Sequence, residues 1–118
     1  MRLTEISYGE ARPIDGYGPG FFRVAGHVLR GPSLITPWDA GPWGGLADSA
    51  GPLALRGRID VLLLGMGAAI AHPPAAFREA LEQAGIGVEV MNSPAACRTY
   101  NVLLGEGRRI AAALLPVG

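Results

Sequence analysis

The side chains that could take part in a reaction or bind a ligand lie mainly between residues 65 and 101. Cys97 is the single cysteine of the chain, and His72 could serve as its base. A thiol near the amino end of a helix is favoured as a thiolate, which is the nucleophilic form. The helical neighbours of Cys97 are apolar, however, and a small buried cysteine is the commoner outcome. We therefore expect Cys97 to be a buried structural residue.

A glycine-rich turn follows the most apolar run of the sequence. Residues 65–70 begin like the dinucleotide-binding pattern G-x-G-x-x-G, with Gly65 and Gly67 in place, but Ile70 stands where the third small residue belongs. The next helix also begins near Pro73 and not at the glycines. This pattern favours a tight turn after a buried strand, and we expect no cofactor.

Ser93 and the two histidines also fail the tests for catalytic or metal sites. No G-x-S-x-G turn surrounds Ser93, so we interpret it as the N-cap of a helix with Pro94 at the first helical position. His27 and His72 stand far apart, with no second histidine at metal-ligand spacing. The sequence therefore indicates no catalytic residue and no metal site.

The elements that must position these side chains alternate between apolar runs and helical patterns. A continuous apolar run over 59–64 is typical of a strand buried on both faces. Helical spacing, prolines and glycines then mark the boundaries of the elements that follow. We predict a helix over 74–84, a strand over 86–91, a helix over 94–104 and a strand over 109–115. A right-handed crossover would make the strands over 59–64 and 86–91 parallel.

Glycine, proline and most aromatic residues are concentrated in the first half of the chain, a pattern typical of short strands joined by tight turns. Gly26-His27 is a position for a hairpin or a bulge. Trp38 and Trp43 would anchor an irregular stretch over 37–52 to the body of the protein. The predicted strands cover 3–7, 21–25, 28–30 and 34–36.

Together these elements predict one α/β domain over 1–118. It would have three layers and a mixed β-sheet, with a βαβαβ C-terminal half and a small β-rich N-terminal section. The formal net charge is zero, which gives no reason to expect a nucleic-acid partner. The apolar stretch 61–71 is shorter than the roughly 20 residues of a spanning helix, so we expect no direct membrane insertion. We expect a cytoplasmic protein, or a mitochondrial-matrix protein if the source is eukaryotic.

The carboxyl ends of parallel strands are the usual ligand-binding edge of such a sheet. The loops 65–68 and 91–94 leave that edge, and the N–H groups of the following helix could receive an anion. This placement predicts a small-anion cleft whose residues are Gly65, Gly67, Ser93, Arg98 and Asn101. As an alternative, polar side chains on the last helix could form a purely structural network, with Tyr100, Glu106 and Arg108 as members.

Three segments of the C-terminal half form a recognisable set: L-G-M-G at 64–67, G-V-E-V-M at 87–91 and A-C-R-T-Y-N-V-L-L-G-E-G-R-R-I-A-A-A-L at 96–114. In these segments the chain resembles the Mth938-like family, also known as DUF498. Met66 stands where the family commonly has threonine. The resemblance implies a compact three-layer fold with a mixed sheet. It implies no assigned catalytic residue, and the family includes the mitochondrial complex I assembly factor 3 proteins.

Two functions follow as hypotheses. The first is a non-catalytic accessory protein with a protein partner, such as a respiratory-complex subunit or another assembly factor, that assists the assembly of complex I. The alternative is a small-anion or nucleotide-binding protein, or an enzyme, that uses the cleft at the strand ends. Arginine can clamp a carboxylate or phosphate with two hydrogen bonds, which is the chemistry that the second hypothesis requires.

Overall fold

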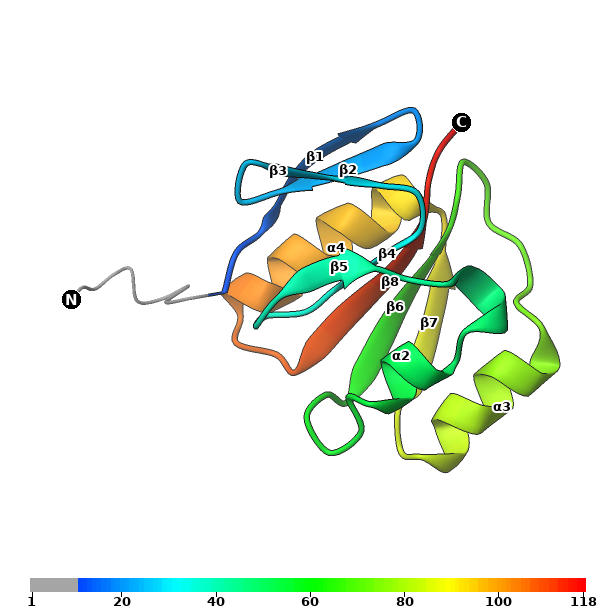
Figure 1. Cartoon of the computed structure of the whole chain (residues 1–118). Helices are drawn as coiled ribbons and strands as arrows, with labels where there is room; N and C mark the ends of the chain where they lie inside the picture. Colours follow the sequence, from blue (N-terminus) through cyan, green and yellow to red (C-terminus); the bar gives the residue numbers. More distant parts are fainter. Residues whose placement is uncertain (1–10) are drawn as a thin grey trace.

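A computed structural model describes residues 11–118 of the chain, and these begin with a three-stranded antiparallel sheet (Figure 1). Its strands are β1 (Ile14–Gly18), β2 (Phe21–Val24) and β3 (His27–Arg30). Ala25 and Gly26 form the turn between β2 and β3, with φ angles of 54° and 79°. Two positive φ angles give the turn the twist that a two-residue hairpin requires.

The predictions for this first sheet are confirmed in part. The strands predicted over 21–25 and 28–30 are present, but the chain reverses at Ala25-Gly26, one residue earlier than expected. The strand β1 was missed, because its sequence contains two glycines and no alternating apolar pattern. The predicted strand over 3–7 lies outside the described residues.

A five-stranded mixed sheet forms the centre of the protein, with the strand order β5-β4-β8-β6-β7. Strands β7, β6 and β8 run parallel, and β4 is antiparallel to β8. The prediction of a parallel pair in the C-terminal half is thus confirmed. One strand, β5, lies within the stretch predicted to be irregular. The strands are β4 (Ser33–Ile35), β5 (Ala40–Pro42), β6 (Val61–Met66), β7 (Gly87–Met91) and β8 (Ile110–Leu115).

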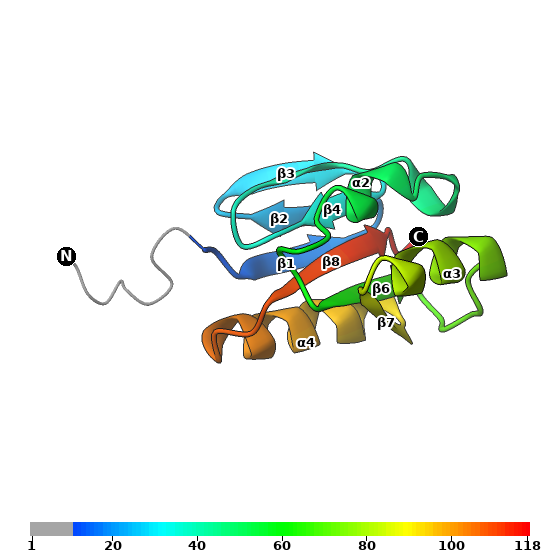
Figure 2. The same cartoon turned by 90° about the horizontal axis from the view of Figure 1, so that it is seen from below.

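The two long helices lie within one or two residues of their predicted ranges. They are α3 (Ala75–Gln83) and α4 (Ser93–Gly105), and a short helix α2 (Ala50–Leu53) follows the 3-10 turn η1 (Gly45–Ala47). Figure 1 shows α4 and the strands β1–β3 toward one side of the view and α2 and α3 toward the other. In Figure 2, α4 and β3 lie at opposite sides of the view, with β8 and β6 between them. Within residues 11–118, no helix has both the length and the apolar character needed to cross a membrane.

The five-stranded sheet is covered on both faces, which confirms the predicted three-layer α/β fold. Side chains along a strand alternate between faces, so Leu63 packs in one core cluster while Leu62 and Leu64 pack in the other. The first cluster joins the sheet to α4 and to the three-stranded sheet. The second joins it to α3 and to the segment around Trp43. Both faces of β6 therefore need apolar side chains.

Only one of the two tryptophans anchors the segment between β4 and β6. Trp43 is 5% exposed, and its indole N–H donates to the backbone oxygen of Asp48 at 2.8 Å. Its ring lies 5.9 Å from that of Phe77 on α3. Trp38, in contrast, is 48% exposed. The expectation that Trp38 pins this segment to the core is wrong, because its ring lies on the surface.

Candidate functional site

The two loops at the carboxyl ends of β6 and β7 meet as predicted, but they close against each other. Ser93 is fully buried between them. Its hydroxyl accepts a hydrogen bond from the Gly67 N–H at 2.9 Å and donates to the backbone oxygen of Leu115. The Ser93 N–H also donates to the Gly67 oxygen at 2.8 Å. This serine therefore joins the ends of β6 and β8 to the start of α4.

Gly65 permits this close approach because it has no side chain. A Cβ atom at this position would lie 2.7 Å from the Ser93 Oγ and 2.9 Å from the Ser93 Cα. Real Cβ atoms do not approach other atoms so closely, and here one of the atoms belongs to the backbone. The space between the two loops is therefore filled by the protein's own atoms.

The amino end of α4 is capped by Asn92 and not by Ser93, which corrects the sequence prediction. The Asn92 Oδ1 accepts from the Ala95 N–H at 2.8 Å, and the Asn92 backbone oxygen accepts from the Ala96 N–H at 3.0 Å. Pro94 has no N–H, and that of Ser93 is already bonded to Gly67. The first turn of α4 thus has no free donor for an anion, contrary to our expectation.

The remaining two residues of the predicted cleft lie further along α4. Asn101 is turned toward β1, where its Oδ1 accepts from the Ile14 N–H at 2.7 Å and its Nδ2 donates to the Ile14 oxygen at 2.9 Å. This pair of bonds fastens the three-stranded sheet to α4. Arg98 is exposed. Anion binding at Arg98 stays a prediction, and no contact among residues 11–118 supports it.

The predicted structural network of Tyr100, Glu106 and Arg108 does not form among the described residues. Tyr100 is fully buried, and its hydroxyl has no hydrogen-bond partner there. Burial raises the pKa of this phenol far above its usual value. Glu106 and Arg108 are exposed, and only their backbone N–H groups bond to the end of α4. Beyond the first turn of α4, the polar side chain with a structural role is that of Asn101.

Cys97 is buried among apolar side chains, as we expected. Burial raises the pKa of its thiol to about 11, against the opposing effect of the Arg98 charge. A thiol with such a pKa is protonated near neutral pH and is a poor nucleophile. Within residues 11–118, no group of three or more His, Cys, Asp or Glu side chains could hold a metal ion.

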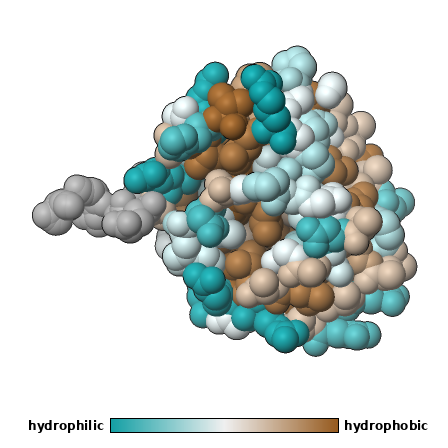
Figure 3. Space-filling view, in the orientation of Figure 1, coloured by the Kyte–Doolittle hydropathy of each residue, from teal (hydrophilic) through white to brown (hydrophobic). Residues whose placement is uncertain are grey.

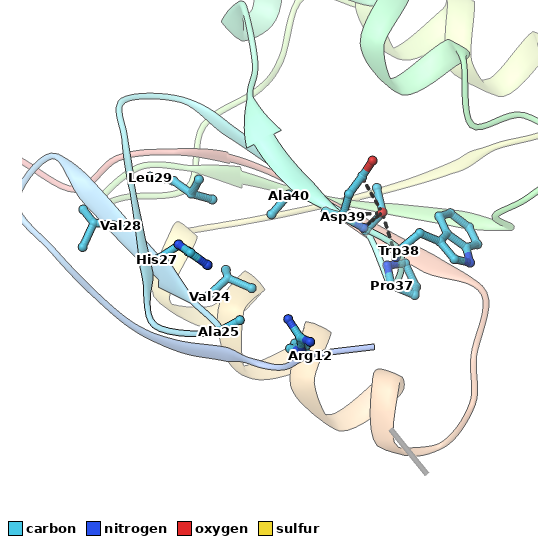
Figure 4. A pocket seen from close by; sticks show the side chains of 11 residues that line it. Arg12, Val24, Ala25, His27, Val28, Leu29, Pro37, Trp38, Asp39 and Ala40 are labelled. Carbon is cyan, nitrogen blue, oxygen red and sulfur yellow. Dashed lines mark hydrogen bonds between the residues drawn. The ribbon is translucent and has the colours of Figure 1, made fainter. Parts of the chain in front are cut away.

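Sequence reasoning missed a hollow of about 420 Å³ between the β2–β3 turn and the segment 36–40 (Figure 4). Segment 36–40 is held by Thr36, whose Oγ1 donates to the Asp39 Oδ1 at 3.0 Å and accepts from the Trp38 N–H at 3.0 Å. Trp38 stands at the side of the hollow with the Arg58 guanidinium 3.9 Å from its ring centre. The residues that line the hollow are Arg12, Val24, Ala25, His27, Val28, Leu29, Thr36, Pro37, Trp38, Asp39 and Ala40.

Replacing Ser93 with alanine should destabilise the protein. The change leaves the Leu115 oxygen and the Gly67 N–H without their buried partner, which costs about 1–3 kcal/mol per group. Urea unfolding of the purified variant measures the loss. Ser49→Ala is the matched control, because the Ser49 side chain makes no capping bond to α2. Equal stability of the two variants would contradict this role of Ser93.

The change Tyr100→Phe should leave stability unchanged or raise it by up to about 1 kcal/mol. It removes a buried hydroxyl that has no partner among residues 11–118, whereas Ser93→Ala removes one that has two. In the same urea unfolding experiment, we therefore expect Ser93→Ala to lower the stability and Tyr100→Phe not to lower it. A loss of stability in Tyr100→Phe would reveal a partner for the hydroxyl.

The thiol of Cys97 should react slowly with a disulfide reagent at pH 8 in the native protein and rapidly after unfolding in guanidinium. Release of the coloured thiol from Ellman's reagent measures both rates on the single cysteine. Because the pKa is about 11 in the folded chain and 9.0 in an exposed thiol, burial of the neutral thiol stabilises the fold fully below pH 9. That contribution is lost as the pH rises from 9 toward 11. Rapid native labelling at pH 8 would contradict the burial.

Two of the relatives found by comparison with known proteins differ in how much is known of them. An uncharacterized protein of Rhodobacter capsulatus is 54% identical over 117 residues, covering 99% of this chain and 94% of that protein. The mouse NADH dehydrogenase [ubiquinone] 1 alpha subcomplex assembly factor 3 is 31% identical over 123 residues, covering 98% of this chain. The match spans 66% of the mouse protein, so a third of that protein has no counterpart here.

The fold and a family model agree with these relatives. The solution structure of a Bordetella pertussis protein, described as a Mth938-like domain, superposes with a TM-score of 0.78 at 26% identity, covering 100% of this chain and 94% of that one. Residues 14–115 match the model of the family described as "Protein of unknown function (DUF498/DUF598)". The resemblance stated from the sequence is thereby confirmed, and the chain belongs to the DUF498/DUF598 family.

Proposed function

We propose that this chain is a non-catalytic binding protein that assists the assembly of respiratory complex I. The observation that carries the proposal is the similarity to complex I assembly factor 3 along nearly the whole chain. The matched region includes all the elements of the fold, so the relationship concerns the domain as a unit.

The state of the reactive groups supports binding as the function. The Cys97 thiol is buried and held in its neutral form, and the Ser93 hydroxyl is committed to Gly67 and Leu115. A nucleophile needs both access to substrate and a base that activates it. Both side chains instead serve the packing around α4.

The surface of the described residues also offers groups that suit a protein partner. Figure 3 shows hydrophobic side chains reaching the surface in patches that polar side chains surround. Trp38 is 48% exposed and Val28 is 45% exposed, and both line the same hollow. Tryptophan and arginine are enriched among residues that dominate binding energy at protein interfaces. The stacked pair of Trp38 and Arg58 therefore supports a role in protein binding.

Deletion of the 54% identical relative in Rhodobacter capsulatus tests the proposal directly. We expect membranes of the deletion strain to lose most of their NADH-dependent quinone reduction, because complex I is not completed. This chain supplied on a plasmid should restore the activity. Succinate-dependent quinone reduction in the same membranes is the control and should not change.

Native gels of the same membranes separate assembly from catalysis. Loss of the fully assembled complex, with accumulation of smaller subassemblies, supports an assembly role. The tagged chain in the complemented strain should also capture complex I subunits or further assembly factors, identified by mass spectrometry. Undiminished NADH-dependent activity in the deletion strain, together with no captured subunit, would contradict the proposal.

A further inference from the structure

We propose that the hollow beside the β2–β3 turn is the docking site for an extended, acidic segment of a partner protein. The segment would place an apolar side chain in the hollow and a carboxylate at its rim. This inference deepens the proposed function and rests on it. It names the hollow as the surface through which the chain contacts its partner protein.

The floor of the hollow suits an apolar side chain. Val24, Leu29 and Ala40 line it from three strands of the two sheets. Its volume of about 420 Å³ lies within the range of small-ligand pockets and exceeds that of any single side chain. Val28 and Trp38 remain largely exposed beside it, at 45% and 48%. A partner side chain that covered this surface would gain the free energy of apolar burial.

The charges around the hollow favour a carboxylate as the neighbouring group. Arg12 lines the hollow and Arg58 lies on the Trp38 ring, so two guanidinium groups are present. The one carboxylate of the lining, Asp39, already accepts a hydrogen bond from Thr36. The rim is therefore net positive and complements an acidic segment.

The same charges disfavour a second copy of this chain as the occupant. A symmetric dimer would bring the hollow of one copy against that of the other, because a two-fold interface uses the same patch on both subunits. The patch that contains Arg12 and Arg58 would then face an identical patch with the same net positive charge. Like charges placed opposite one another oppose association, which leaves a partner of opposite charge.

Trp38 is positioned to contact such a segment. Figure 4 shows it on the side of the hollow formed by 37–40, with Val24 and His27 on the other side. Thr36 fixes the backbone of this segment through its bonds to the N–H groups of Trp38 and Asp39. The Arg58 guanidinium also restrains the indole ring, because it lies 3.9 Å from the ring centre. An aromatic group held in place loses little conformational entropy on binding.

The inference can be tested by NMR on the whole, isotope-labelled chain. The probe is the blocked peptide Gly-Ser-Leu-Glu-Leu-Glu-Ser-Gly, and the control probe has lysine at both glutamate positions. We expect the acidic peptide to shift the Trp38 indole signal and the amide signals of residues 24–29, 36 and 38–40. The affinity should fall as salt is added, since the contact is partly electrostatic. Equal shifts with the basic peptide, or shifts confined to other residues, would overturn the inference.

Three variants sharpen this test. Trp38→Ala should weaken binding of the acidic peptide by at least about fivefold. Arg58→Gln should weaken it by about twofold to fivefold, the range for a single exposed ion pair. Arg56→Gln is the matched control, because Arg56 is exposed and only two residues away, whereas it is the Arg58 guanidinium that lies over the Trp38 ring; this variant should bind as the unmodified chain does. The buried Trp43 indole signal reports that each variant is folded.

The two proposals can fail separately. If the tagged chain captures complex I proteins and Trp38→Ala captures them equally well, the docking site is wrong and the binding function stands. If neither form captures a partner and complex I activity is normal in the deletion strain, the function itself is wrong. A stable homodimer in light scattering that Arg58→Gln strengthens would identify a second copy as the occupant and overturn the acidic-segment inference.

Discussion

The architecture depends on the need to bury both faces of the strands β6 and β8. Each strand directs apolar side chains to two different core clusters, so neither face can be left in contact with water. The helix α4 and the three-stranded sheet together cover one face, and α3 and the Trp43 segment cover the other. The apparently separate N-terminal sheet is thus part of the same folding unit, and Asn101 fastens it there.

The same constraint closes the edge of the sheet where α/β proteins usually bind ligands. The start of α4 is drawn so tightly against β6 that Gly65 has no room for a side chain. The hydroxyl of Ser93 and the N–H groups of the first helical turn are all used to join neighbouring elements. The hollow of this fold lies instead between the β2–β3 turn and segment 36–40.

Local patterns in the sequence predicted the C-terminal half well. The apolar run that forms β6 and the proline and glycine boundaries of α3 and α4 depend on neighbouring residues alone. The predictions that failed concern residues whose position depends on tertiary contacts. Asn101 bonds to Ile14, which is 87 positions away in the sequence. The exposure of Trp38 depends on the conformation of segment 36–40. The hollow combines Arg12, the β2–β3 turn and segment 36–40, which no spacing rule connects.

The position of β8 in the sheet has a consequence for how the chain reaches its native state. β8 is the final strand in sequence, yet it lies in the middle of the five-stranded order, between β4 and β6. Until β8 has been synthesised, β4 and β6 have no strand between them, and their edges stay open to other chains. Completion of the five-stranded sheet therefore waits for the insertion of β8, and a chaperone that covers these edges before that moment would protect the chain from aggregation.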